Sequence, residues 1–235
     1  MSDSSLNADA LLDGLDPTQY EAVSSAHNPI AILAGAGSGK TRVLTRRIAH
    51  RVSTGAIDPQ RTMSVTFTRK AASELRTRLR VLGLRDNITT GTFHSLAYAQ
   101  LHERWAERGV RAPDMLDRKF AVIGRLLGRR ANTSMILDTL HELEWITARN
   151  ISLERYPHEI DRLDRKPPIP PADIVQTAKR YAEEKRNQRV IDFDDLLTLA
   201  TRDIETDPEY ASIIRWRHRH VFVDEFQDVN PLQFR

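Results

Sequence analysis

The order of apolar and polar positions along the chain predicts alternating strands and helices. Four short apolar or β-branched runs have the length of buried strands, at residues 30–33, 63–67, 87–92 and 220–224. They do not alternate cleanly between apolar and polar positions, which favours a sheet covered on both faces. Apolar residues at helical spacing follow each of the first three runs, as in Leu44, Ile48 and Val52. A strand, helix, strand, helix order predicts parallel strands and an α/β fold.

The middle of the chain has a different pattern. From about Trp105 to Arg189 the strand signals disappear and amphipathic helical segments replace them, separated by the proline cluster at 165–171. We therefore expect one α/β domain, made of residues 1–104 and 191–235, with a helical subdomain inserted at 105–190.

Composition narrows the class of protein. The 235 residues are 40% hydrophobic and 29% charged, and they include no cysteine, which excludes disulfides and thiolate metal sites. The polar N-terminus and the absence of a long apolar stretch argue against secretion or a membrane partner and favour the cytoplasm. Net charge is only +3, but six basic residues stand against Glu74 between positions 69 and 85. That cluster fits a nucleic-acid contact or an ordinary solvated helix face.

A glycine-rich segment, "AGAGSGKT" at 34–41, follows the first predicted strand and precedes a helix. Its three glycines permit a tight turn whose N–H groups point inward, and the helix N-terminus adds partial positive charge. Such a loop binds a triphosphate, with Lys40 reaching the β and γ phosphates and Thr41 ligating Mg²⁺. Ala34 stands where the strict pattern has glycine. The alternative is a glycine-rich turn without function.

Two adjacent carboxylates, Asp224 and Glu225, follow the last predicted strand. Beside a phosphate loop, an aspartate in this position holds Mg²⁺ through its water shell. Glu225 is placed to orient and deprotonate an attacking water, which favours hydrolysis over transfer to a substrate oxygen. Without the phosphate loop, the pair would be an ordinary strand end.

Several segments in this order resemble superfamily 1 DNA helicases of the UvrD, PcrA and Rep type. They are "LDPTQYEAV" (15–23), "AGAGSGKTRVL" (34–44), "VTFTRKAASELRTRL" (65–79), "GTFHSLA" (91–97), "IDFDDLL" (191–197) and "VDEFQDVNPLQ" (223–233). The resemblance implies a RecA-like P-loop domain with an inserted helical subdomain. It also implies ATP and Mg²⁺ as cofactors and single-stranded DNA as partner.

The resemblance also assigns site residues. Gln19 would hydrogen-bond the adenine edge, Arg42 would stack on adenine, and Gln227 would sense the γ-phosphate. The expected catalytic residues are Lys40, Asp224, Glu225 and Gln227, and the expected metal ligands are Thr41 and Asp224. The expected nucleotide-binding residues are Gln19, Ala34, Gly35, Ala36, Gly37, Ser38, Gly39, Lys40, Thr41 and Arg42.

Single-stranded DNA is held by basic groups on phosphates and by aromatic faces under bases. The expected DNA contacts are Phe67, Arg69, Lys70, Thr92, Phe93 and His94, at the carboxyl ends of the second and third predicted strands. The alternatives are core positions for the two phenylalanines and a structural hydrogen bond for His94. Arg69 stands where the related motif usually has asparagine.

Two further features have structural interpretations. Asp192 and Asp194 are expected to cap and support a helix. His218 and His220 lack an evident third ligand, so we predict no metal there.

The related helicases have two RecA-like domains with ATP between them, and the second supplies arginines to the γ-phosphate. We therefore expect the chain to be the N-terminal part of a 3′ to 5′ DNA helicase or translocase that acts on DNA with a 3′ single-stranded tail. Alone, it is expected to turn over slowly. The alternatives are a P-loop ATPase that is not a helicase, a nucleotide- and DNA-binding module without turnover, and the motor part of a helicase–nuclease. The sequence gives no oligomeric state.

Overall fold

The structure is a computed structural model that describes residues 7–35, 37–84, 88–129 and 131–235. The chain forms two compact units. The first unit comprises Met1–Phe93 and Asp207–Gln227, and the second comprises His94–Thr206 and Asp228–Arg235. Each unit is described by itself below.

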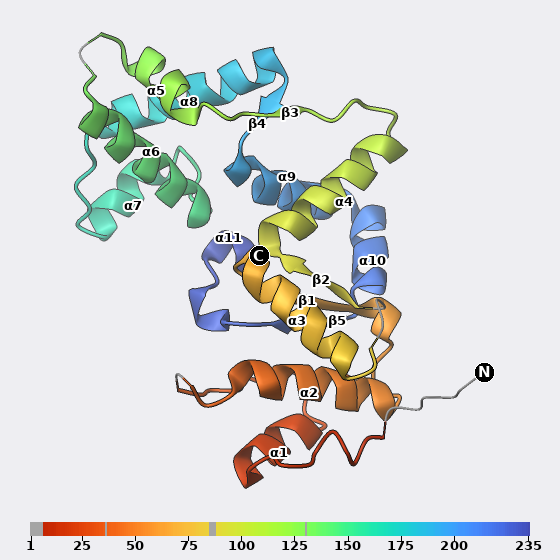
Figure 1. Ribbon diagram of the computed structural model, residues 1–235. Helices are drawn as coiled ribbons and strands as arrows, with labels where there is room; N and C mark the ends of the chain where they lie inside the picture. The colour runs from red at the N-terminus through yellow and green to blue at the C-terminus, as the bar shows by residue number, and fades with distance from the viewer. Residues whose placement is uncertain (1–6, 36, 85–87, 130) are drawn as a thin grey trace. The chain divides into compact units, whose positions relative to one another are not determined.

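A parallel sheet forms the centre of the first unit (Figure 1). Its elements are α1 (Pro17–Ser24), α2 (Lys40–Ser53), the 3₁₀ helix η1 (Pro59–Arg61), β1 (Thr62–Thr66), α3 (Arg69–Val81), β2 (Thr89–Thr92), α10 (Pro208–Arg217) and β5 (His220–Val223), with the short η2 (Phe226–Asp228) at its end. The strand order is β2-β1-β5, and Val65 in β1 lies opposite Gly91 and Val223. The sequence therefore predicted these strands and their parallel direction correctly.

The core of the first unit lies between helices and sheet. Ile48 of α2 and the buried Leu75 and Leu79 of α3 form one apolar cluster with the partly buried Phe222 of β5. Helix α1 packs on α2. Because α2 begins directly after the phosphate loop, this packing fixes the direction in which the loop faces.

The first predicted strand is wrong. Residues 30–33 are irregular and pair with no described strand. Ile30 is 39% exposed and Leu33 is 95% exposed, so the apolar run does not enter the core. A strand needs a neighbour for its N–H and C=O groups, and apolar composition alone cannot supply one.

The second unit is mainly helical. It contains α4 (Phe93–Glu107, apart from its first residue), β3 (Asp114–Met115), α5 (Lys119–Leu127), α6 (Thr133–Ala148), α7 (Tyr156–Arg162), α8 (Pro171–Gln188), β4 (Val190–Ile191), α9 (Phe193–Thr206) and α11 (Pro231–Phe234). One core joins α5, α6, α7 and α8 around Ile123, Tyr156 and Ile174. Another joins α4, β4 and α9 around Leu101 and Leu196.

Two features of this unit bear on the sequence prediction. The chain between 105 and 189 is not purely helical, because β3 pairs in parallel with β4. A two-residue strand is too short to show periodicity, so the pattern of apolar and polar positions could not predict it. The proline cluster does interrupt the helices, as predicted, and α8 begins at Pro171.

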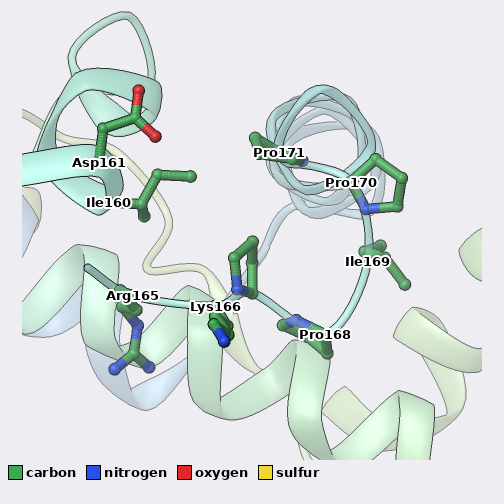
Figure 2. Close-up of a pocket in the computed structure, with 9 residues that line it drawn as sticks. Ile160, Asp161, Arg165, Lys166, Pro168, Ile169, Pro170 and Pro171 are labelled. Carbon is green, nitrogen blue, oxygen red and sulfur yellow. The ribbon is translucent and has the colours of Figure 1, made fainter. Parts of the chain in front are cut away.

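The proline segment borders an open hollow of about 470 Å³ (Figure 2). Arg165 in its lining pairs with Glu142 at 2.7 Å, and that glutamate is only 2% exposed. Burial and the bond to Glu142 also raise the pKa of the Tyr156 hydroxyl above its ordinary range. The segment is therefore anchored by a buried ion pair.

The bounds of the α/β domain and of the inserted helical subdomain stay a prediction. The compact units change over at 93/94, 206/207 and 227/228, whereas the sequence analysis placed the changes at 104/105 and 190/191. None of the described helices is long and apolar enough to cross a membrane.

Candidate functional site

The phosphate loop runs directly into α2. Gly37 and Gly39 have φ values of 76° and 85°, a backbone conformation that side chains with a Cβ rarely adopt. Among the described residues no side chain caps α2, and its first turn has no acidic residue, so its first N–H groups remain available to an anion. The Ser38 hydroxyl donates to the Gly35 carbonyl at 2.7 Å and steadies the turn. Ala36, also expected in this site, lies outside the described residues.

Lys40 lies between this loop and the acidic pair. Its Nζ is 3.4 Å from the Ala34 carbonyl and 4.0 Å from Glu225 Oε2. The ammonium and the carboxylate are both partly exposed, so the ion pair contributes little to stability. Its value is positional, because it shows that segments more than 180 residues apart in sequence meet at one site.

The acidic pair extends from the end of β5. The backbone N–H of Asp224 donates to the Val65 carbonyl at 2.9 Å, which continues the ladder between β5 and β1. Burial raises the pKa of Asp224, and the neighbouring Glu225 raises it further. Lys40 opposes both effects. A cation brought close to Asp224 would therefore relieve an unfavourable charge.

Glu225 has an unusual backbone conformation. Its φ is 53°, which is rare for a residue with a side chain and is common at functional sites. Its Oε2 accepts from Gln227 Nε2 at 2.6 Å. Lys40, Glu225 and Gln227 thus form one chain of polar contacts at the carboxyl edge of the sheet.

The groups present fit a magnesium ion. Thr41, the second residue of α2, offers a hydroxyl oxygen, and Asp224 offers a carboxylate. Hard oxygen ligands of this kind suit Mg²⁺, which keeps several waters and commonly takes further ligands from phosphates. Within the described residues no group of three or more His, Cys, Asp and Glu side chains could hold a metal by itself. An ion here would depend on bound phosphate and water.

Gln19 reaches the phosphate loop from α1. Asp16 and Gln19 form a capping box, with the Gln19 N–H donating to Asp16 Oδ1 at 2.8 Å. The Gln19 Nε2 also donates to the Ser38 carbonyl at 3.1 Å. A Cβ added to Gly39 would lie 3.4 Å from that same nitrogen. Arg42 is exposed, and its Nη2 donates to the Gly14 carbonyl at 2.8 Å.

The expected DNA contacts of the first unit gather on the same sheet edge. The Phe67 and Phe93 rings follow β1 and β2, and their centroids are 5.4 Å apart. Both rings are half-buried, and Thr92 ends β2 beside them. Arg69 and Lys70 are exposed in the first turn of α3, which Thr68 caps through the N–H of Ala71. Aromatic rings and exposed cations thus share an edge with Asp224.

His94 belongs to the second unit. Its ring stacks on Phe193, with centroids 3.9 Å apart and an interplanar angle of 14°. Burial lowers the pKa of His94, although Asp194 opposes the shift, so the neutral ring is favoured. The sequence drew attention to the aspartates of "IDFDDLL" and missed Phe193. The sequence signal for Phe193 was an aromatic residue between acidic residues at the start of a helix. In the structure Phe193 is 55% exposed.

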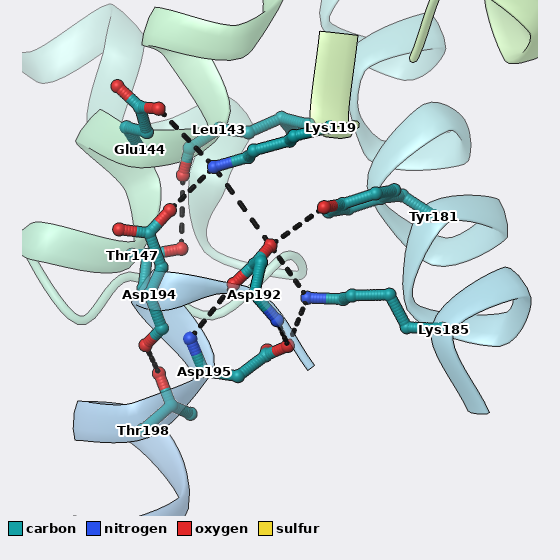
Figure 3. A network of polar contacts seen from close by, with 10 residues as sticks. All are labelled: Lys119, Leu143, Glu144, Thr147, Tyr181, Lys185, Asp192, Asp194, Asp195 and Thr198. Carbon is teal, nitrogen blue, oxygen red and sulfur yellow. Dashed lines mark hydrogen bonds and ion pairs between the residues drawn. The ribbon is translucent and has the colours of Figure 1, made fainter. Parts of the chain in front are cut away.

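A polar network fixes the turn that carries Phe193 (Figure 3). Asp192 accepts from the Asp195 N–H and so caps α9, as predicted. Lys185 from α8 bridges Asp192 at 3.0 Å and Asp195 at 2.6 Å, and the Tyr181 hydroxyl donates to Asp192 at 2.8 Å. Asp194 instead pairs with Lys119 at 2.6 Å. Helices α5, α8 and α9 are therefore held together at the base of the His94–Phe193 stack.

Comparison with known proteins gives an independent result. The family model for the UvrD/REP helicase N-terminal domain matches residues 15–235. The ATP-dependent DNA helicase UvrD2 of Mycobacterium tuberculosis is 40% identical over 248 residues, which cover 98% of this chain and 35% of the relative. The ATP-dependent DNA helicase PcrA of Leuconostoc citreum is 31% identical over 238 residues, covering 97% of this chain and 31% of the relative.

The chain thus spans about a third of the length of these relatives. The match begins just before Gln19 and includes the phosphate loop, the aromatic edge and the acidic pair. The resemblance inferred from the sequence is therefore confirmed. The chain belongs to the UvrD/REP helicase N-terminal domain family.

Proposed function

We propose that this chain is the N-terminal ATP-binding part of an ATP-dependent 3′ to 5′ DNA helicase or translocase, and that it binds ATP–Mg²⁺ and single-stranded DNA. The observation that carries the proposal is the contact of Lys40 with Glu225 at 4.0 Å. It joins a loop suited to phosphates with a carboxylate pair suited to a metal and a water.

The residues of the first unit have distinct roles in this proposal. The backbone N–H groups of the loop and Lys40 bind the phosphates, while Thr41 and Asp224 hold Mg²⁺, which would neutralise charge developing on the γ-phosphate. Glu225 orients the attacking water and accepts its proton. Gln227, hydrogen-bonded to Glu225, responds to the presence of the γ-phosphate. We further propose a RecA-like fold for this part, with the helical subdomain inserted in it.

The DNA side of the proposal uses the same sheet edge. Arg69 and Lys70 contact phosphates, while Phe67, Phe93 and Thr92 lie where bases or sugars would pass. Within the second unit, His94, backed by Phe193, is proposed as a DNA contact in its own right. Since Val65 connects β1 to Asp224, a change at the nucleotide has a short route to Phe67.

The resemblance to UvrD-type helicases motivates a proposal for the rest of the cycle. We propose that a second RecA-like domain, outside these residues, provides arginines to the γ-phosphate and the other part of the DNA track. Removal of such an arginine lowers turnover by about 10³ to 10⁵. ATP binding would close the two domains and hydrolysis would reopen them. The 235 residues alone should then bind ATP but hydrolyse it slowly.

Nucleotide binding and turnover test the proposal together. ATP affinity and ATPase rate are measured with and without single-stranded DNA for the wild type, Lys40→Ala and Glu225→Gln. We expect Lys40→Ala to weaken ATP binding at least about tenfold, the worth of one charge-assisted hydrogen bond. Glu225→Gln should retain binding and lose turnover about 10² to 10⁴-fold, the usual contribution of a general base.

The matched control is Lys166→Ala, which removes an exposed lysine of the proline segment and should change neither quantity. Equal ATP affinity and turnover in the wild type and Lys40→Ala would contradict the proposal. Retained binding without any turnover in the wild type would leave a binding module as the function of this chain.

A further inference from the structure

Helix α2 is attached through its arginines to the segment that precedes the phosphate loop. Four of its arginines donate to backbone carbonyls of the segment that precedes the loop. Arg42 reaches Gly14, Arg46 reaches Leu11 and Asp13, Arg47 reaches Ala22, Val23, Ser25 and His27, and Arg51 reaches Ser25. The segment that carries Gln19 is therefore attached to α2 along most of its length.

Arg47 is the buried centre of this attachment. It is only 3% exposed, and no described carboxylate forms an ion pair with it. Its Nη1 donates to the carbonyls of Ala22 and Ser25, both at 2.8 Å, and its Nη2 donates to His27 at 3.1 Å. Burial lowers the pKa of Arg47, and the nearby Arg51 lowers it further. A charge buried at this cost is retained only where its hydrogen bonds are well formed.

Of the carbonyls that Arg47 binds, those of Ala22 and Val23 belong to the C-terminal end of α1, Ser25 is its C-cap, and His27 lies just beyond it. The last carbonyls of a helix have no partner inside the helix, and the helix dipole makes this end negative. Helix α1 has no basic residue in its own last turn. Arg47 therefore supplies from α2 the cation and the donors that α1 lacks.

The other end of α1 contacts the loop. Gln19 closes the capping box with Asp16 and donates to Ser38 at 3.1 Å, next to the left-handed Gly39. Gln19 is thus positioned from two directions, through its own bond to the loop and through the rigid helix that Arg47 holds. A shift of α1 would move Gln19 while leaving Lys40 and the loop glycines in place.

We infer that Arg47 is a positioning residue for nucleotide-base selectivity: by holding the C-terminal end of α1, it places the Gln19 amide where it can discriminate the base of a bound nucleoside triphosphate. The inference rests on the proposed function, since it requires ATP at the phosphate loop, and on the adenine contact that the resemblance implies for Gln19. It separates recognition of the base, which depends on α1, from recognition of the phosphates, which depends on α2.

Competition against a fluorescent ATP analogue tests this separation. ATP, GTP and inorganic tripolyphosphate are the competitors, and the protein is used as the full chain. We expect Gln19→Ala and Arg47→Met each to reduce the preference for ATP over GTP about tenfold, the worth of one hydrogen bond, while tripolyphosphate affinity changes less than about twofold. The double variant should lose no more selectivity than either single variant, because both act through one contact.

Two further variants keep the test decisive. Arg47→Lys retains a charge but not the planar guanidinium, so its preference for ATP over GTP should fall by at least about threefold. This variant replaces Arg47→Met in the test if Arg47→Met does not fold. Arg215→Met removes an exposed arginine of α10 and should have wild-type selectivity.

The outcomes separate the inference from the proposed function. A wild type that binds neither ATP nor tripolyphosphate overturns both. A wild type that binds ATP without preferring it to GTP overturns the inference alone. Folded Arg47 variants with unchanged selectivity, or with equal losses for all three competitors, also overturn it, because the arginine would then be merely structural.

Discussion

Removal of Lys185 should destabilise the second unit strongly and in a pH-dependent way. Lys185 lies between Asp192 at 3.0 Å and Asp195 at 2.6 Å, and Asp192 is only 3% exposed. In Lys185→Met, Asp192 keeps the Tyr181 hydroxyl and the backbone N–H of Asp195, but the two carboxylates lose the cation between them. Breaking a buried ion pair costs about 3 to 5 kcal/mol, and the remaining bonds place this case near the lower value.

The pH dependence follows from the carboxylates. Burial raises the pKa of Asp195, and the charge of Asp192 adds to the effect. For Asp192, burial is again the largest influence and acts upward, but Lys185 and Lys119 together hold the pKa below its ordinary value. Without Lys185 both pKa values should rise. A group whose folded pKa is raised contributes stability below its unfolded pKa, and that contribution is lost as pH rises through the folded pKa. The deficit should therefore be larger at pH 7.5 than at pH 5.

Urea unfolding at the two pH values, followed by far-UV circular dichroism and tryptophan fluorescence, measures the deficit. Lys166→Met is the control and should stay within about 0.5 kcal/mol of the wild type, as surface changes usually do. Adding Asp195→Asn to Lys185→Met should recover part of the loss, since one of the two facing charges is gone. A deficit below about 0.5 kcal/mol, or one that does not depend on pH, would refute the reasoning.

Three further predictions concern other parts of the chain. Gly39→Ala should weaken ATP binding and lower stability by about 1 kcal/mol or more, because its φ of 85° disfavours a Cβ; titration and thermal unfolding check both. For single-stranded DNA binding, the slope of the log binding constant against log salt concentration should become shallower by about 1.4 when Arg69 and Lys70 are both replaced by alanine, or about 0.7 per lost phosphate contact. An unchanged slope would exclude both residues as phosphate contacts. Arg165→Met should lower the free energy of unfolding by about 3 to 5 kcal/mol, because Glu142 stays buried without its cation. Urea unfolding measures the loss, and Arg125→Met, which removes an exposed partner of Glu184, is the control.

Local signals explain what the sequence could predict. The phosphate loop, the acidic pair and the strands β1, β2 and β5 each have a short pattern with a single physical meaning. Glycines directly before a helix, or a β-branched run before a carboxylate, can be recognised in the sequence without knowledge of the partner. The sequence predicted that the loop and the acidic pair act on one triphosphate, and the contact of Lys40 with Glu225 brings them together although residues 30–33 form no strand.

The remaining features depend on neighbours that a linear pattern does not reveal. Residues 30–33 have strand composition but no pairing partner among the described strands. Arg47 has the spacing of a solvated helix face, yet it is buried because the carbonyls of α1 surround it. Phe193 becomes notable only once His94 stacks on it. In each case, contacts distant in sequence decided the outcome.

The most direct test of the central claim is a crystal structure with a non-hydrolysable ATP analogue and Mn²⁺, whose anomalous scattering locates the ion. The account predicts the triphosphate against the N–H groups of residues 37–41, with the metal beside the Thr41 hydroxyl and the Asp224 carboxylate. A triphosphate bound elsewhere, or a metal remote from Asp224 while the loop holds phosphate, would contradict it.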